Sequence, residues 1–429
     1  MSEVVFPQGF LWGTATSAHQ VEGHNTNNDW WAWEQAGRVK TPSGAACDQY
    51  HRFRDDFDLA KSLHHNAHRF SIEWSRIELR EGEFDPQAIA HYRDVLAALR
   101  ERGLEPVVTL HHYTNPIWLA DQGGWTNPKV VDYFTRFVHH VVEELGSQVR
   151  IWLTINEPLV YMWMHYLDGT GPPGAHDLGQ AMQALEHLVR AHVAAYHEIH
   201  RVATQHGWPA QVTIAMHAQP FTPCRWWHPV DQFIARVSTR VYNHQFLEAV
   251  MDGRLRLPGR PPVRLPDAHD TLDIIGMNFY GRVFMRFVPT SGGWPGIRCS
   301  TRHHREVTER NFLEWDVHPP TLLTVLRWAK PYGKPILITE NGICTTDDRQ
   351  RERFILRHLA VVGQALQEGL PVMGYLYWSL LDNFEWADGY GPRFGLIEVD
   401  YATQARRVRD SATRYAEICR TNRLVCEDV

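Results

Sequence analysis

Residues 67–110 read AHRFSIEWSRIELREGEFDPQAIAHYRDVLAALRERGLEPVVTL, and this stretch decides the fold class. Two short apolar runs, 67–72 and 106–110, enclose a longer segment, Asp85–Arg102, in which apolar residues recur every three or four positions. The short runs have the length and composition of buried strands, and the segment between them has the periodicity of an amphipathic helix. A strand, a helix and a second strand in this order predict a βαβ unit with parallel strands.

The same alternation continues along the whole chain. Helical patterns also cover 128–145, 178–206 and 349–368. The eight runs that we expect to form strands are 10–15, 67–72, 106–110, 150–155, 211–215, 272–277, 335–339 and 372–378. Eight strands that alternate with helices predict an α/β fold of the (β/α)8 type, a TIM barrel.

Loops after the strands shape the active face of such a barrel. The stretch 282–334 reads as a long loop followed by a helix that begins near Pro319. It contains Gly292 and Gly293, and we expect it to form part of the site entrance. No Ser- or Gly-rich linker divides the chain, so we expect one catalytic domain, residues 1–429, with elaborated βα loops.

The composition argues against several classes of function. The 429 residues include 43 Lys and Arg against 49 Asp and Glu, a net charge of −6 without a basic stripe, which argues against nucleic acid and membrane surfaces as partners. No apolar run is long enough to cross a bilayer. The 17 Trp outnumber the 15 Tyr, which points to an aromatic-lined pocket.

The cysteines are scattered singly, without a CxxC pair. They are Cys47, Cys224, Cys299, Cys344, Cys419 and Cys426. This spacing fits neither a zinc site nor a disulfide framework, so we expect free thiols in a reducing compartment. Because no signal peptide is recognisable at the N-terminus, we expect a cytoplasmic protein. The sequence leaves the oligomeric state open, a homo-oligomer included.

The 26 histidines raise the question of a metal site. His197 and His200 lie one helical turn apart, where a zinc pair can form, but no HExxH motif occurs and no carboxylate joins them at ligand spacing. A solvated helix face is the simpler interpretation, and we expect neither a metal nor a cofactor.

Polar and aromatic residues follow seven of the eight apolar runs. In chain order they are His19, Gln20 and Glu22; Glu73 and Trp74; His111, His112 and Tyr113; Asn156 and Glu157; Asn278, Phe279 and Tyr280; Glu340 and Asn341; and Trp378, Ser379, Asp382, Glu385 and Trp386. Because the carboxyl ends of barrel strands meet at one face, these side chains are candidates for a common site.

Two of these residues, Glu157 and Glu340, directly follow apolar strands. A carboxylate in such a place is costly unless it is paired or functional. Two of them in one aromatic pocket indicate the paired-carboxylate chemistry of glycoside cleavage. The alternative is a pair of structural Glu residues that Arg69 or backbone donors neutralise.

Six motifs of the chain are similar, in the same order, to those of glycoside hydrolase family 1, the β-glucosidase family. They are FLWGTATSAHQVEG (10–23), RFSIEW (69–74), TINEP (154–158), NFY (278–280), ILITENGIC (336–344) and WSLLDNFEW (378–386). The resemblance extends over essentially the whole chain. It implies a retaining, exo-acting β-glycosidase that releases a terminal non-reducing sugar, with β-glucosides as the first expectation and β-fucosides and β-galactosides as further substrates.

The resemblance also implies a role for each site residue. Glu340 would be the nucleophile and Glu157 the acid/base, with their carboxyls about 5 to 5.5 Å apart as retention requires. The sugar would be bound by Gln20, His112, Asn156, Tyr280, Trp378, Glu385 and Trp386, with Trp315 stacking on the leaving group and Arg69 and Asn278 as supporting residues. The partners would be small β-glycosides or short β-linked oligosaccharides such as cellobiose.

One position departs from the family pattern, and three alternatives remain. The family usually has Trp after the sugar-binding His, where this chain has Tyr113. A 6-phospho-β-glycosidase is disfavoured because Glu385 would repel a 6-phosphate. A non-catalytic sugar-binding barrel is opposed by the intact pair of Glu157 and Glu340, and a metal-dependent barrel hydrolase would lose activity with EDTA.

Overall fold

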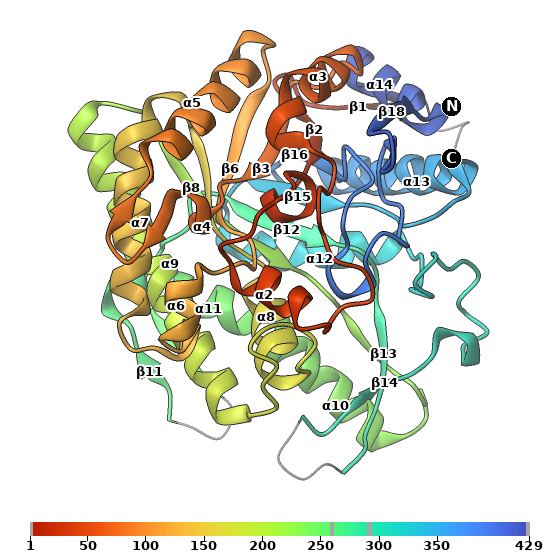
Figure 1. Ribbon diagram of the computed structural model, residues 1–429. Coiled ribbons are helices and arrows are strands. Elements are labelled where there is room, and N and C mark those ends of the chain that lie inside the picture. Colours follow the sequence, from red (N-terminus) through yellow and green to blue (C-terminus); the bar gives the residue numbers. More distant parts are fainter. Residues whose placement is uncertain (1–2, 258–260, 290–293, 426–429) are drawn as a thin grey trace.

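A closed barrel of eight parallel strands forms the centre of the molecule (Figure 1). The computed structural model describes residues 3–257, 261–289 and 294–425. The barrel strands are β2 (Leu11–Ala15), β3 (Ala67–Ser71), β6 (Glu105–His111), β7 (Ile151–Asn156), β8 (Gln211–His217), β12 (Ile275–Phe279), β15 (Ile336–Asn341) and β16 (Val372–Trp378). They follow one another around the barrel in chain order, and all eight predicted runs supply one of them, so the predicted barrel is confirmed.

Apolar side chains from most of the strands pack together inside the barrel. Leu11, Val107, Ile151, Leu337 and Leu376 belong to one buried cluster. Close approach of the strands also requires glycine: a Cβ at Gly342 would lie 1.8 Å from the carbonyl oxygen of Trp378. Gly342 follows Glu340 by two residues, so this approach fixes the end of β15 against β16.

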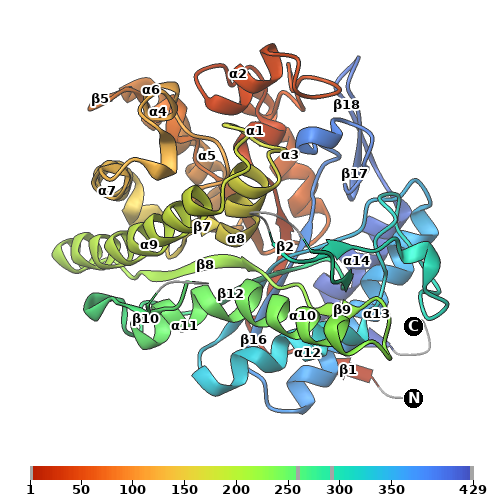
Figure 2. The ribbon, with the colours of Figure 1, turned by 90° about the horizontal axis from the view of Figure 1, so that it is seen from below.

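Helices cover the outside of the barrel. They are α1 (Ala18–Val21), α2 (Asp29–Gln35), α3 (Gln49–Ser62), α4 (Trp74–Ile77), α5 (Pro86–Glu101), α6 (Ile117–Asp121), α7 (Val130–Leu145), α8 (Pro158–Met162), α9 (Leu178–His206), α10 (Pro229–Thr239), α11 (Gln245–Asp252), α12 (Pro320–Ala329), α13 (Asp348–Gln367) and α14 (Asp410–Thr421). The long helix α9 packs against α7 (Figure 2). Its ends match the prediction because the Asp177 side chain accepts a hydrogen bond from the Gln180 amide, and Gly207 ends it with φ 72°.

The stretch 282–334 differs from the predicted loop. It contains β13 (Val283–Arg286) and β14 (Ile297–Arg298), which form a three-stranded sheet, the rim sheet, with β9 (Phe221–Pro223). Strands of two to four residues are too short to show an alternating pattern in the sequence. The predicted helix near Pro319 is α12, and the predicted loop positions Gly292 and Gly293 lie outside the described residues.

The prediction of free thiols is wrong for two cysteines, since Cys224 and Cys299 form a disulfide bond. The Cys224 amide donates to the Met285 carbonyl and the Cys299 amide donates to the Phe284 carbonyl, so both cysteines flank β13. This pairing brings their Cα atoms to 6.3 Å, within the usual range for a disulfide. Three further cysteines are free and buried, namely Cys47, Cys344 and Cys419, and Cys426 lies outside the described residues.

The remaining strands form small two-stranded sheets. They pair β1 (Glu3–Val5) with β19 (Arg423–Val425), β4 (Glu78–Arg80) with β5 (Glu83–Phe84), β10 (Arg254–Leu255) with β11 (Val263–Arg264), and β17 (Ile397–Asp400) with β18 (Ala405–Val408). The first pair brings the two ends of the described chain together, as Figure 1 shows. Among the described residues, no helix combines the length and apolar character needed to cross a membrane.

Candidate active site

A pocket of about 550 Å³ opens at the carboxyl ends of the barrel strands. Its volume is in the range of sites that bind small molecules. Ten of the twelve predicted site residues line it: Gln20, His112, Asn156, Glu157, Tyr280, Trp315, Glu340, Trp378, Glu385 and Trp386. The other two, Arg69 and Asn278, lie behind this lining and contact the two carboxyl groups.

Glu157 and Glu340 reach the pocket from two barrel strands, β7 and β15, which β8 and β12 separate. Their exposed fractions are only 8% and 4%. Glu157 follows the last residue of β7 and has φ 44°, in the left-handed region that non-glycine residues rarely adopt. This backbone conformation costs on the order of 1–3 kcal/mol, and it places the carboxyl group at the mouth of the barrel instead of continuing the strand.

A buried cation holds the Glu340 carboxylate. The fully buried Arg69 guanidinium donates to Glu340 Oε1, and the Tyr280 hydroxyl donates to Oε2 at 2.6 Å. Arg69 is itself fixed by Asn156 Oδ1 at 2.7 Å and by Thr109 Oγ1 at 3.0 Å. Glu340 is thus paired with a positive charge, which favours its ionised form.

Neutral donors hold the Glu157 carboxyl. The Tyr113 hydroxyl donates to Oε2, and the Asn278 amide donates to Oε1 at 2.8 Å. The Thr339 hydroxyl donates to Asn278 Oδ1 at 2.6 Å and so fixes the orientation of that amide. Within the described part of the chain, no Lys or Arg forms an ion pair with Glu157, so its charge is less well compensated than that of Glu340.

Burial raises the pKa of both carboxyl groups. For Glu340, the Arg69 charge opposes this rise most strongly, while the charge of Glu157 adds to it. For Glu157, the hydrogen bonds from Tyr113 and Asn278 oppose the rise in pKa more strongly than the Arg69 charge does. Two buried carboxyl groups that repel each other hold a proton more readily than isolated glutamates, and the Arg69 charge favours the ionised form of Glu340.

Aromatic rings and polar groups form the wall next to the carboxyl pair. The Trp378 indole donates to Glu385 Oε1 at 3.2 Å, and burial raises the pKa of Glu385 well above its usual value. Trp386, with φ 53°, lies parallel to the His112 ring at a centroid distance of 6.2 Å. Such a wall offers hydroxyl partners beside flat apolar faces, as a sugar ring requires.

Gln20 and Asn156 are held in place by other side chains and the backbone. The Gln20 amide donates to the Phe384 carbonyl at 2.8 Å and to Asn383 Oδ1 at 3.0 Å. Asn156 Nδ2 lies 3.3 Å from His112 Nε2, while Asn156 Oδ1 accepts from Arg69. These contacts fix both amides before a ligand binds, which lowers the entropic cost of binding.

The outer part of the pocket is lined by the rim sheet and by Trp315. The lining residues of the rim sheet are Phe221, Met285, Ile297 and Arg298, of which Arg298 alone is a cation. The Trp315 ring meets Tyr280 edge to face at 6.0 Å. A substrate that enters the pocket therefore passes this outer part before it reaches the carboxyl pair.

Sequence reasoning missed several residues of the pocket. Tyr113 is among the polar residues that follow the third apolar run, but the sequence does not predict that its hydroxyl donates to Glu157. The others include Trp163, Met164, Asp168, His217 and Tyr242. His217 ends β8, two residues after the fifth apolar run, so its place in the sequence was a usable signal. The Tyr242 hydroxyl lies 2.7 Å from His217 Nδ1, a contact between distant segments that the sequence does not indicate.

Other residues that follow the apolar runs have structural roles. His19 pairs with Glu34 at 2.9 Å, and Glu22 pairs with Arg76 at 2.7 Å. His111 lies 3.1 Å from Asn115 Oδ1. Glu73, Asn341 and Asp382 accept hydrogen bonds from Thr114, Tyr375 and Arg409 respectively.

The fold and the site together define a class of enzyme. A (β/α)8 barrel that presents two buried carboxyl groups, one beside a guanidinium and one among neutral donors, in a pocket with indole walls is the arrangement of a glycoside hydrolase.

Comparison with known proteins identifies the family. The model of "Glycosyl hydrolase family 1" matches residues 2–424. The chain is 31% identical to beta-glucosidase A of Thermotoga maritima over 98% of both proteins, and 29% identical to a beta-galactosidase of Pyrococcus woesei over 97% of this chain and 98% of the other. A solved beta-glycosidase from Pyrococcus horikoshii superposes with a TM-score of 0.93 at 37% identity, covering 100% of this chain and 97% of the other.

The chain belongs to glycosyl hydrolase family 1. It is a glycoside hydrolase, a retaining β-glycosidase that releases a terminal β-linked sugar. A beta-glucosidase from Thermotoga maritima in complex with glucoimidazole is also similar, with a TM-score of 0.88 at 30% identity over 97% of this chain and 99% of the other.

Proposed function

We propose that the enzyme cleaves β-glucosides, with Glu340 as the nucleophile and Glu157 as the acid/base. The observation that carries these roles is the difference between the two carboxyl groups: Arg69 contacts Glu340, whereas Glu157 receives hydrogen bonds from neutral groups. The names of the relatives, mostly beta-glucosidases, support the choice of sugar.

In the first step, Glu340 attacks the anomeric carbon while Glu157 gives its proton to the departing glycosidic oxygen. Tyr280 and Arg69 hold the attacking carboxylate in place through their hydrogen bonds. The product of this step is a covalent glycosyl-enzyme and a free leaving group.

In the second step, a water molecule attacks the glycosyl-enzyme. Forming the ester removes the negative charge of Glu340, and with it the repulsion between the two carboxyl groups. With this repulsion gone, Glu157 is the more readily ionised and takes a proton from the water as it attacks. Hydrolysis returns both groups to their first state with retention at the anomeric carbon.

The residues around the carboxyl pair would position the sugar. Gln20, His112, Glu385 and Trp386 would bind its hydroxyls, and Trp378 would lie beneath its ring. Asn156, held by Arg69, would bind the 2-hydroxyl, a contact that strengthens in the transition state. Trp315 would stack on the leaving group from the outer part of the pocket.

Single substitutions test the two roles. Glu340→Ala should abolish turnover of every substrate, because no other group forms the ester. Glu157→Ala should slow unactivated glucosides by about 10²- to 10⁴-fold. With a dinitrophenyl leaving group, which needs no proton, the Glu157→Ala variant should still form the glycosyl-enzyme. Equal loss in both variants with this activated substrate would contradict the assignment.

We propose an unphosphorylated sugar as the substrate. Glu385 lies in the pocket wall next to Trp378, where its carboxyl group, whether ionised or protonated, offers a 6-phosphate no positive charge. On a panel of nitrophenyl β-glycosides, glucoside, fucoside and galactoside should be cleaved and 6-phosphoglucoside should not. Faster cleavage of the 6-phosphoglucoside would instead support a 6-phospho-β-glycosidase. Cleavage of any of them excludes a non-catalytic sugar-binding barrel.

We also propose that residues 1–429 act as one catalytic domain that degrades cellobiose and other short β-glucosides in the cytoplasm. The near-balanced charge of the chain supports small glycosides over nucleic acid or membranes as partners. Cell fractionation with an activity assay tests the compartment. Activity mainly outside the cytoplasmic fraction would contradict it.

A further inference from the structure

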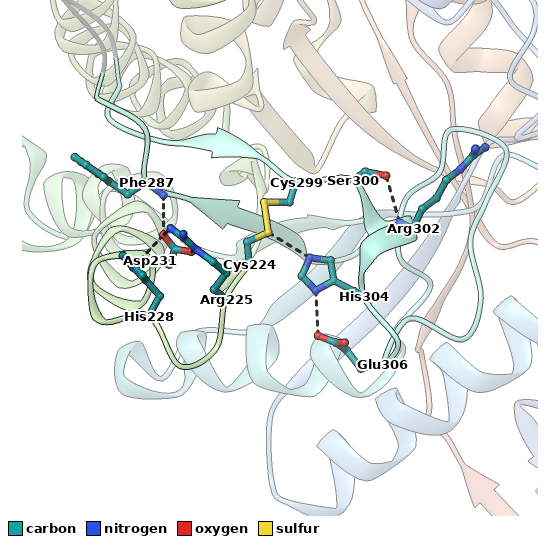
Figure 3. The surroundings of a disulfide bond; sticks show 10 residues. All are labelled: Cys224, Arg225, His228, Asp231, Phe287, Cys299, Ser300, Arg302, His304 and Glu306. Atoms are coloured by element: carbon teal, nitrogen blue, oxygen red, sulfur yellow. Dashed lines mark hydrogen bonds and ion pairs between the residues drawn. A yellow bond between two sulfur atoms is a disulfide. The ribbon is translucent and has the colours of Figure 1, made fainter.

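A cluster of metal-ligand residues lies at the edge of the rim sheet, outside the catalytic pocket (Figure 3). Cys224 and Cys299 form the disulfide, and His304 Nε2 lies 3.6 Å from Cys224 Sγ. The three ligand atoms all lie within 4.8 Å of one another. Two sulfurs and an imidazole nitrogen at this separation are a donor set that zinc prefers once the sulfurs are thiolates.

His304 is held in the orientation of a metal-bound histidine. The residue is only 6% exposed, and its ring stacks on Phe284 at a centroid distance of 3.7 Å. Nε2 faces the cysteines, while Nδ1 lies 3.3 Å from Glu306 Oε1, as Figure 3 shows. In metal sites, a carboxylate on the second ring nitrogen fixes the tautomer and makes the imidazole a better ligand.

The cysteines themselves are half-buried, so a reductant can reach the bridge. In a reducing compartment, two electrons and two protons from a thiol donor would convert the disulfide to two thiols. The two sulfurs would remain close, because the backbone hydrogen bonds of Cys224 and Cys299 to β13 do not depend on the bridge.

We propose that, when the bridge is reduced, Cys224, Cys299 and His304 bind one Zn²⁺ ion. Binding releases the two thiol protons, and the two thiolates neutralise the charge of the ion. Zn²⁺ takes four ligands, so a water molecule completes the site. The inference does not depend on the proposed catalytic roles. Arg298 lines the pocket and directly precedes Cys299 in the chain. The disulfide in the oxidised enzyme and the zinc site in the reduced enzyme would therefore anchor the same edge of the rim sheet.

Metal titration of the whole enzyme tests this inference. After reduction with a phosphine and removal of the reductant without oxygen, the enzyme should bind one equivalent of Zn²⁺. Co²⁺ should give a thiolate charge-transfer band at the same stoichiometry. The disulfide form should bind no Zn²⁺ at this site, and binding that is equal in both forms would overturn the inference.

Matched variants locate the ligands. Cys299→Ser and His304→Ala should lose the bound equivalent, whereas His303→Ala, which alters the exposed neighbour of His304, should bind Zn²⁺ like the wild type. Glu306→Gln should fold normally and weaken zinc binding by about 10- to 100-fold. Circular dichroism and aryl glucoside hydrolysis confirm that each variant is folded. No bound equivalent in the reduced wild type, or unchanged affinity in both His304→Ala and Glu306→Gln, would overturn the inference.

Discussion

The floor and the outer part of the pocket are built in different ways. The floor consists of Arg69, Asn156, Glu157, Asn278 and Glu340, which lie in or directly after the barrel strands β3, β7, β12 and β15 and bond to one another. The outer part consists of Trp315 and of the rim sheet, whose short strands lie outside the barrel. We infer that the floor performs the chemistry common to all substrates, and that the outer part selects among leaving groups. Each part can be perturbed separately.

The largest effect should come from Arg69→Gln, which removes the only cation that contacts Glu340 within the described chain. Without this charge the pKa of Glu340 rises further, so the nucleophile is protonated at neutral pH and kcat/KM should fall by about 100-fold for every substrate. Breaking a buried pair should also lower the free energy of unfolding by about 3–5 kcal/mol. Steady-state kinetics and thermal unfolding measure the two effects.

Arg351→Gln is the matched control. Arg351 is equally buried and pairs with Asp348, outside the pocket. This variant should also lose stability, but the folded fraction should keep its kcat and pH profile. An equal loss of activity in the two variants would mean that Arg69 acts only through folding.

A smaller effect, confined to the pH profile, should follow from Tyr113→Phe. The Tyr113 hydroxyl stabilises the ionised form of Glu157 and so lowers its pKa. Its removal raises that pKa, and Glu157 then keeps its catalytic proton to higher pH. The basic limb of the kcat/KM profile should therefore move upward by about one pH unit. Tyr161→Phe, whose hydroxyl contacts Asn115 instead, should leave the limb in place.

The smallest effect should come from Trp315→Ala in the outer part. Loss of an aromatic contact with the leaving group should lower kcat/KM for aryl β-glucosides and cellobiose by about 2- to 10-fold. β-Glucosyl fluoride, which has no ring as its leaving group, should be hydrolysed at the wild-type rate. A comparable loss with the fluoride would show that Trp315 supports the floor instead.

The floor could be predicted from the sequence because it follows from local patterns. A short apolar run followed by a polar residue is visible without any structure, and the barrel then brings distant strand ends to one face. Glu157 and Glu340 were found in this way. Helix α9 was predicted to its last residue because its periodicity and both caps are encoded within the segment itself.

The rest depends on contacts between segments that carry no local pattern. The bond from Tyr113 to Glu157 requires left-handed backbone at both residues, with φ 74° and 44°. The Cys224–Cys299 bridge requires the pairing of β9, β13 and β14, strands too short to recognise in the sequence. In both cases, tertiary packing and not residue type decides which groups meet.

The central claim, that Glu340 forms a covalent bond to the sugar, can be tested directly by trapping that bond. A 2-deoxy-2-fluoro-β-glucoside with a dinitrophenyl leaving group removes the 2-hydroxyl contact that stabilises both transition states, yet still allows the first step. Mass spectrometry of the digested enzyme should find one 2-fluoroglucosyl group on the peptide that contains Glu340. A label on the Glu157 peptide, or turnover without any covalent adduct, would contradict the account.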